Sequence, residues 1–184
     1  MKSLIVIRGV PGTGKSTYAL KQERACYEQG SNAFTVSRDT IRMDMILCAV
    51  KTPECFIEDF NIEMEDLEQI SFGMDYKKNY QISFRSQLFD NLVQRKFREV
   101  IVEYLEDPQI DDVIIDATNI KEDDLKFYSK LREKYKCAIY IHELNKEFGS
   151  VHEVPEYIMR NCRIAKEKTA LLAISIADKI LYVE

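Results

Sequence analysis

Residues 9–17 read Gly-Val-Pro-Gly-Thr-Gly-Lys-Ser-Thr and match the phosphate-loop pattern Gly-x-x-x-x-Gly-Lys-Ser/Thr. Glycines allow the backbone to turn tightly, so that successive N–H groups point at the phosphates of a nucleotide. We expect Lys15 to reach the β- and γ-phosphates and the Ser16 hydroxyl to ligate Mg²⁺. The other residues expected to contact the nucleotide are Gly9, Pro11, Gly12, Thr13, Gly14 and Thr17. The stretch therefore predicts a site for ATP, or another nucleoside triphosphate, together with Mg²⁺.

The sequence around this loop has the context that the motif requires, a buried strand before it and a helix after it. The apolar run at 4–8 predicts the strand, and residues 15–29 predict a helix that ends at Gly30. Further strands are predicted at 33–37, 113–116, 137–142 and 179–183, and further helices at 40–50, 84–105, 122–135 and 155–173. Because strands alternate with helices, we expect an α/β protein of the P-loop kinase fold, with a five-stranded parallel sheet and helices on both faces.

The composition is that of a globular protein. With 184 residues, of which 46% are apolar, the chain is expected to form a single domain, residues 1–184. Residues 51–83 show no clear period, and we interpret them as an insertion or a lid-like segment. No apolar run approaches the ~20 residues of a membrane span, and the five scattered cysteines argue against a disulfide or zinc framework. We therefore expect a cytoplasmic protein (in the host cytosol if a phage encodes it) without membrane contact.

A second polar cluster, Arg38-Asp39-Thr40-Ile41-Arg42, lies where the second predicted strand meets its helix. Ligands of open α/β sheets bind at this edge. Asp39 is able to cap the helix and shares one helix face with Arg42. Cations are disfavoured at a helix N-terminus, so Arg38 and Arg42 are best explained there if they hold an anion. The alternative is that Asp39 is only a cap and that both arginines are solvated.

The third predicted strand ends in Ile114-Ile115-Asp116-Ala117-Thr118-Asn119. In a P-loop fold this strand lies beside the first, so Asp116 would lie near Mg²⁺ or near an acceptor-binding arginine. Thr118 and Asn119 would bond either a substrate or the loop itself. The alternative is a plain turn at the strand end, with asparagine at its corner.

Three segments together resemble the P-loop 5′-polynucleotide kinases, the kinase modules of phage and bacterial end-healing enzymes. The matching segments are Gly-Val-Pro-Gly-Thr-Gly-Lys-Ser-Thr at 9–17, Ser-Arg-Asp-Thr-Ile-Arg at 37–42 and Ile-Ile-Asp-Ala-Thr-Asn at 114–119. The resemblance implies that Asp39 is the general base on an acceptor 5′-hydroxyl and that Arg42 grips the acceptor's phosphate. It also implies that Asp116 orients the acceptor site, and that the partner is a 5′ end of DNA or RNA.

The arginine-rich lid of that family has no counterpart in residues 144–153, which contain no arginine. A transferring γ-phosphoryl group needs positive charge beyond Lys15 and Mg²⁺. The helix predicted after this segment carries Arg160 and Arg163, three residues apart on one face. We expect Arg160 or Arg163 to replace the lid arginines at the donor phosphates. The alternative is that both are surface residues.

The function expected first is ATP- and Mg-dependent transfer of the γ-phosphate to a 5′-hydroxyl end of DNA or RNA. Its catalytic residues would be Lys15, Asp39 and Arg42, and the further substrate contacts would be Arg38, Asp116, Thr118 and Asn119. A net charge of −5 gives no support to a broad nucleic-acid surface, but recognition of an end needs few phosphate contacts. One alternative is a small-molecule kinase of the same fold, acting on a nucleoside, sugar or nucleotide-sugar as zeta-type toxins do. Another is a nucleotide-dependent binding or regulatory protein, which the missing lid arginines favour.

Overall fold

The structure is a computed structural model, and it describes residues 2–63, 65, 87–148 and 154–183. The chain divides into two compact units. The sheet unit contains Met1–Ser37 and Ile101–Glu184, and the helical unit contains Arg38–Val100. The organisation as one domain with an insertion at 51–83 stays a prediction, and residues 64 and 66–83 of that segment lie outside the described residues.

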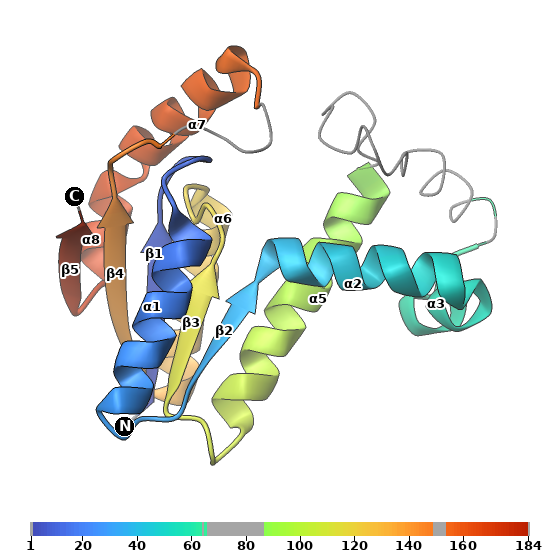
Figure 1. Ribbon diagram of the computed structural model, residues 1–184, viewed down its shortest axis with the longest axis horizontal. Helices are drawn as coiled ribbons and strands as arrows, with labels where there is room; N and C mark the ends of the chain where they lie inside the picture. The colour runs from blue at the N-terminus through green and yellow to red at the C-terminus, as the bar shows by residue number, and fades with distance from the viewer. Residues whose placement is uncertain (1, 64, 66–86, 149–153, 184) are drawn as a thin grey trace. The chain divides into compact units, whose positions relative to one another are not determined.

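The sheet unit contains a five-stranded parallel sheet with the strand order β2-β3-β1-β4-β5 (Figure 1). The strands are β1 (Ser3–Arg8), β2 (Ala33–Ser37), β3 (Asp112–Asp116), β4 (Ala138–Leu144) and β5 (Lys179–Val183). Every pairing between neighbours is parallel, and β3 lies beside β1 as expected. This arrangement confirms the predicted fold class.

Helices cover both faces of this sheet, as the apolar sequence of β1 requires. Leu4, Ile5, Val6 and Ile7 are all buried, and successive side chains of a strand point to opposite faces. In Figure 1, α1 (Lys15–Glu28) lies in front of the sheet and α6 (Glu122–Tyr135) lies behind it. The sheet thereby presents the carboxyl ends of β1 and β3 at one edge, where the phosphate loop begins.

The helix predicted at 155–173 is in fact two helices, α7 (Glu156–Lys168) and α8 (Ala170–Ile176). The interruption at Thr169 has a cause that lies far away in the sequence. The guanidinium of Arg8 donates to the Lys166 carbonyl and to the Thr169 hydroxyl. The Lys166 carbonyl is the group that a continuous helix would offer to the amide of Ala170, so the buried arginine ends α7.

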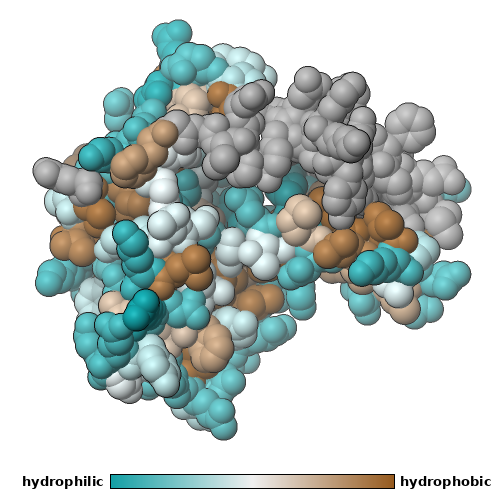
Figure 2. Space-filling model, viewed as in Figure 1, coloured by the Kyte–Doolittle hydropathy of each residue, from teal (hydrophilic) through white to brown (hydrophobic). Residues whose placement is uncertain are grey.

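The helical unit is built from α2 (Arg38–Lys51), α3 (Pro53–Phe60) and the first part of α5 (Gln87–Glu106). The helix predicted from residue 84 is described from Gln87 onward, because 84–86 lie outside the described residues. The core of this unit contains Met45, Ile46, Ala49, Phe56, Phe89, Leu92 and Val93. The outer face of α2 carries exposed apolar side chains at Met43, Leu47 and Val50, and Figure 2 shows apolar surface there.

The start of α2 corrects one expectation. The helix begins at Arg38 rather than at Thr40, so Asp39 lies within its first turn and is not an N-cap. Among the described helices, none is long and apolar enough to cross a membrane.

Candidate active site

The phosphate loop connects β1 to α1 and has the backbone shape that its glycines permit. Gly12 and Gly14 adopt positive φ angles of 80° and 75°, which side chains other than glycine rarely tolerate. A Cβ on Gly9 would lie 2.6 Å from the Thr13 hydroxyl, which itself donates to the Val10 carbonyl at 2.9 Å. The loop is therefore closed on itself, and its glycines cannot be exchanged without a clash or backbone strain.

The N-terminus of α1, which directly follows the loop, suits an anion. Its first turn contains no acidic residue, and no side chain caps it. The N–H groups and the positive end of the helix dipole are therefore available to phosphate. Lys15 begins the helix, and its ammonium lies 2.8 Å from the Val10 carbonyl, at the mouth of the loop. Ser16 and Thr17 are exposed at the same end. These groups fit a nucleoside triphosphate, and ligation of its Mg²⁺ by the Ser16 hydroxyl stays a prediction.

Thr118 and Asn119, which follow β3, form hydrogen bonds with the phosphate loop and with the strand before it. The Thr118 carbonyl accepts a hydrogen bond from the Gly9 amide at 3.2 Å. Asn119 is fully buried with a positive φ of 52°, and its amide nitrogen donates to the Ile7 carbonyl at 2.6 Å. Tyr128 donates to its amide oxygen at 2.7 Å. Of the two roles expected for Asn119, bonding to the loop strand is the one found, and no exposed polar atom is left for a substrate.

Arg8 is a part of this support that sequence reasoning missed. It is 1% exposed, and its Nη1 lies 2.6 Å from Oε1 of Glu143. Its Nε donates to the Asn119 carbonyl at 3.2 Å, and Lys166 lies 3.1 Å from the same carboxylate oxygen of Glu143. A buried charge is tolerated only when it is paired and hydrogen-bonded. An arginine that ends an apolar strand directly before a phosphate loop was the signal in the sequence.

Asp116 lies where the sequence predicted, at the carboxyl end of β3. It is buried and lies in register with Ile7 on β1 and with Ser37 on β2. It therefore belongs to the sheet edge that carries the phosphate loop. Its role toward Mg²⁺ or an acceptor stays a prediction.

The expected acceptor residues Arg38, Asp39 and Arg42 lie on the first two turns of α2, in the helical unit. Asp39 is exposed, and a carboxylate is favoured at this end of a helix. Arg42 forms an ion pair: its Nη1 lies 2.6 Å from Oδ1 of Asp90 on α5. Its guanidinium also lies 5.7 Å from the ring centre of Phe89. The side chain expected to grip an acceptor phosphate is thus already paired with a carboxylate.

Arg38 is also held inside the helical unit. Its guanidinium lies 4.9 Å from the ring centre of Phe97, a cation–π arrangement. The alternative that both arginines are merely solvated is therefore wrong. Both pack against aromatic rings of α5.

Arg163 on α7 contacts the segment between β4 and the described start of α7. Its guanidinium forms two hydrogen bonds to the carboxylate of Glu147, at 3.0 and 2.8 Å, and a third to Glu156 at 2.7 Å. The hydrogen bonds from Arg163 lower the pKa of Glu147 below its ordinary value. Arg160 is exposed on the same helix. Contact of either arginine with donor phosphates stays a prediction.

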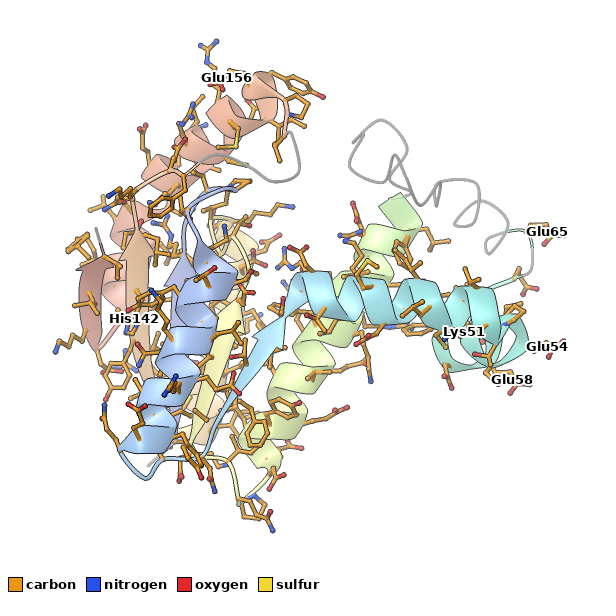
Figure 3. All side chains as sticks on the ribbon, viewed as in Figure 1. Lys51, Glu54, Glu58, Glu65, His142 and Glu156 are labelled. Carbon is orange, nitrogen blue, oxygen red and sulfur yellow. The ribbon has the colours of Figure 1, made fainter. Side chains whose placement is uncertain are left out.

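The phenol of Tyr18 on α1 lies 3.1 Å from Nδ1 of His142 on β4. Figure 3 labels His142 on the sheet. Burial, and to a lesser degree the charge of Lys179, lowers the pKa of His142. Burial raises the pKa of Tyr18. Both rings are therefore neutral near pH 7, and they join the loop helix to the sheet.

A family model described as an AAA domain matches residues 4–147, which contain the phosphate loop and four of the five strands. The chain belongs to this AAA-domain family. It is an AAA-type P-loop protein whose loop has the geometry of a nucleotide site. A comparison with curated proteins found no match.

Several solved structures are similar to this chain at low sequence identity. One belongs to the PezAT chromosomal toxin–antitoxin system of Streptococcus pneumoniae, with 13% identity, a TM-score of 0.58, and coverage of 100% of this chain and 67% of that chain. Another is the AvrRxo1-ORF1:-ORF2 complex, with 13% identity, a TM-score of 0.58, and coverage of 100% of this chain and 55% of that one. A third is the APS kinase CysC of Mycobacterium tuberculosis, with 14% identity, a TM-score of 0.46, and coverage of 93% and 96%. At these identities the first two likenesses concern the fold alone.

Proposed function

We propose that this AAA-domain protein is an ATP- and Mg-dependent phosphotransferase whose acceptor is the hydroxyl group of a small molecule such as a nucleoside or sugar. The donor side of the proposal rests on the phosphate loop, with Lys15 at its mouth and the uncapped N-terminus of α1 behind it.

The observation that carries the acceptor side is the ion pair between Arg42 and Asp90. Arg42 and Asp90 are only 17% and 33% exposed in their side chains, and their charged atoms lie 2.6 Å apart. An acceptor phosphate would have to displace Asp90 and leave that partly exposed carboxylate without its partner, at a cost of about 1 kcal/mol or less. A neutral acceptor, bound through its hydroxyl groups, requires no such exchange.

In the proposed reaction the carboxylate of Asp39 accepts the proton of the acceptor hydroxyl. The acceptor oxygen then bonds to the γ-phosphorus while the bond to the β,γ-bridging oxygen breaks, which gives ADP and a phosphorylated acceptor. Lys15 and the loop N–H groups hold the phosphates, and Mg²⁺, when bound, neutralises part of their charge. Asp116, at the adjoining strand end, is assigned to orient this machinery.

A 5′-polynucleotide kinase is the second candidate, favoured by the order Arg38-Asp39-Thr40-Ile41-Arg42 at the start of α2. In that case a terminal phosphate of the acceptor replaces Asp90 on Arg42. The two candidates share donor chemistry and differ only in what Arg42 holds during the reaction.

The test is transfer of label from γ-labelled ATP with Mg²⁺ to a panel of acceptors. The panel contains nucleosides, sugars, nucleotide-sugars, 3′-nucleoside monophosphates and a 5′-hydroxyl oligonucleotide. We expect label on a nucleoside or sugar, and none with the Lys15→Ala variant or in EDTA. Label on the oligonucleotide alone would replace the proposal with the second candidate, and no label on any acceptor would leave a binding or regulatory protein.

A further inference from the structure

We propose that Phe148 is a contact for the donor nucleotide, and that the free part of its ring stacks on the nucleobase. The inference extends the proposed function, because it assumes that the phosphate loop binds a nucleotide. It concerns only residues of the sheet unit.

The first observation is that Phe148 is anchored to the phosphate loop itself. Its backbone amide donates to the Gly12 carbonyl at 2.9 Å. Its ring carbons lie 3.6 Å from the position that a Cβ on Gly14 would occupy. One part of the ring therefore packs on the loop at the start of α1, the place where phosphates bind.

The second observation is that the rest of the ring is open. Phe148 is 69% exposed. A single exposed aromatic residue needs no explanation on an ordinary surface, but this one is fixed against a nucleotide-binding loop. An aromatic ring that packs on the loop through two of its carbons and is otherwise largely exposed offers a platform for a base, since every base has a π-face.

The third observation concerns charge and fixation. The ammonium of Lys146 lies 5.5 Å from the centre of the Phe148 ring, within cation–π range. Glu147, between the two residues, is held by both nitrogens of the Arg163 fork. A bidentate pair of this kind fixes direction as well as distance. Arg163 is thus a positioning residue that keeps Phe148 on the loop.

The experiment is calorimetric titration of the full chain with Mg·ATP and with Mg·tripolyphosphate, which carries phosphates but no base. For Phe148→Ala we expect about tenfold weaker binding of ATP, the loss that accompanies removal of one base–aromatic stack. Tripolyphosphate should bind as it does to wild type. Phe148→Tyr, which keeps the ring, should bind ATP normally. Tyr27→Ala, which removes an exposed ring at the other end of α1, is the matched control and should change neither affinity.

Two results would overturn the inference. One is an ATP affinity of Phe148→Ala within twofold of wild type. The other is an equal loss for ATP and tripolyphosphate, which would mean that the ring only supports the loop. Glu147→Gln tests the positioning role of Arg163. We expect this variant to bind ATP more weakly and to bind tripolyphosphate as the wild type does. A wild type that binds ATP through Phe148 but transfers phosphate to no acceptor would refute the proposed function and leave this inference standing.

Discussion

The sheet unit and the helical unit each hold a shielded arginine, and they hold it in different ways. Arg8 in the sheet unit is 1% exposed and bonds to Glu143, to the Asn119 and Lys166 carbonyls and to the Thr169 hydroxyl. Arg42 in the helical unit keeps 17% of its side chain exposed and pairs with the partly exposed Asp90. Arg8 is part of a buried network with several partners, whereas Arg42 is ion-paired with one partly exposed carboxylate.

This difference separates the two halves of the proposed chemistry. The donor loop is held by the backbone geometry of its glycines and by a buried polar network beneath it. The acceptor residues lie on a helix surface and are set by a single carboxylate and two aromatic rings. The nature of the donor can therefore be inferred from the fold. The nature of the acceptor depends on which group, an anion or a hydroxyl, binds at Arg42.

The largest effect on stability is expected where Arg8 is lost. Arg8→Met removes the guanidinium from the buried Glu143 carboxylate and from the Asn119 and Lys166 carbonyls, and breaking a buried pair costs about 3–5 kcal/mol. Arg42→Met, in the more exposed pair, should cost about 1 kcal/mol or less. Urea unfolding of both variants checks this ranking. Equal losses would show that the two arginines do not differ as described.

Lys15→Ala should disable the donor side of the proposed reaction, the phosphate loop. We expect phosphoryl transfer to fall about 10²–10³-fold, since one charge aimed at the developing transition state is removed. Single-turnover label transfer at saturating ATP measures this. Lys21→Ala, on an exposed position of the same helix, is the control and should keep the wild-type rate. An active Lys15→Ala variant would contradict the role of the loop in catalysis.

Asp39→Asn should disable the acceptor side of the proposed reaction, where Asp39 is the general base. A general base contributes at least about 10²-fold to the rate, so kcat should fall by that factor while ATP affinity is unchanged. Because Asp39 is exposed and is not a helix cap, the fold should tolerate the change. Asp44→Asn, exposed on the same helix, is the control. If nucleotide binding is lost together with kcat, Asp39 belongs to the donor site.

The smallest effect expected is a dependence of stability on pH through His142. Burial lowers its pKa from the ordinary 6.5, so the folded protein favours the neutral ring. Below pH 6.5 the unfolded chain binds the extra proton first, and stability should decrease as the pH falls toward the folded pKa. Denaturant unfolding at several pH values checks this, and His142→Gln should flatten the curve in that window. An unchanged curve would remove His142 as its cause.

The sequence was most informative where local chemistry decides structure. The phosphate loop, the strand that precedes it and the parallel sheet follow from glycine positions and from apolar runs that fit only a sheet covered on both faces. The start of α2 and the break at Thr169 did not follow from local pattern. The break depends on a guanidinium about 160 residues away, and no local period carries that information.

In the candidate site too, contacts between residues distant in the sequence could not be predicted from local patterns. The position of Asn119 was predicted, but its role depends on burial beneath the loop, which a motif does not reveal. The pairing of Arg42 with Asp90 joins two helices through residues that lie 48 positions apart in the chain. Arg8 and Phe148 belong to none of the three quoted motif segments that indicated function, since each owes its importance to what the fold packs against it.

The central claim is that Arg42 is ion-paired with Asp90 and that the acceptor therefore needs no phosphate. The most direct test compares kcat/KM for a nucleoside and for its 3′-monophosphate in the wild type and in Asp90→Asn. We predict that the wild type uses the nucleoside at least as well as the monophosphate. Asp90→Asn should then shift the ratio about tenfold toward the monophosphate, roughly the 1.4 kcal/mol of one charged hydrogen bond. A wild type that prefers the monophosphate more than tenfold, with the preference erased in Arg42→Ala, would contradict the claim.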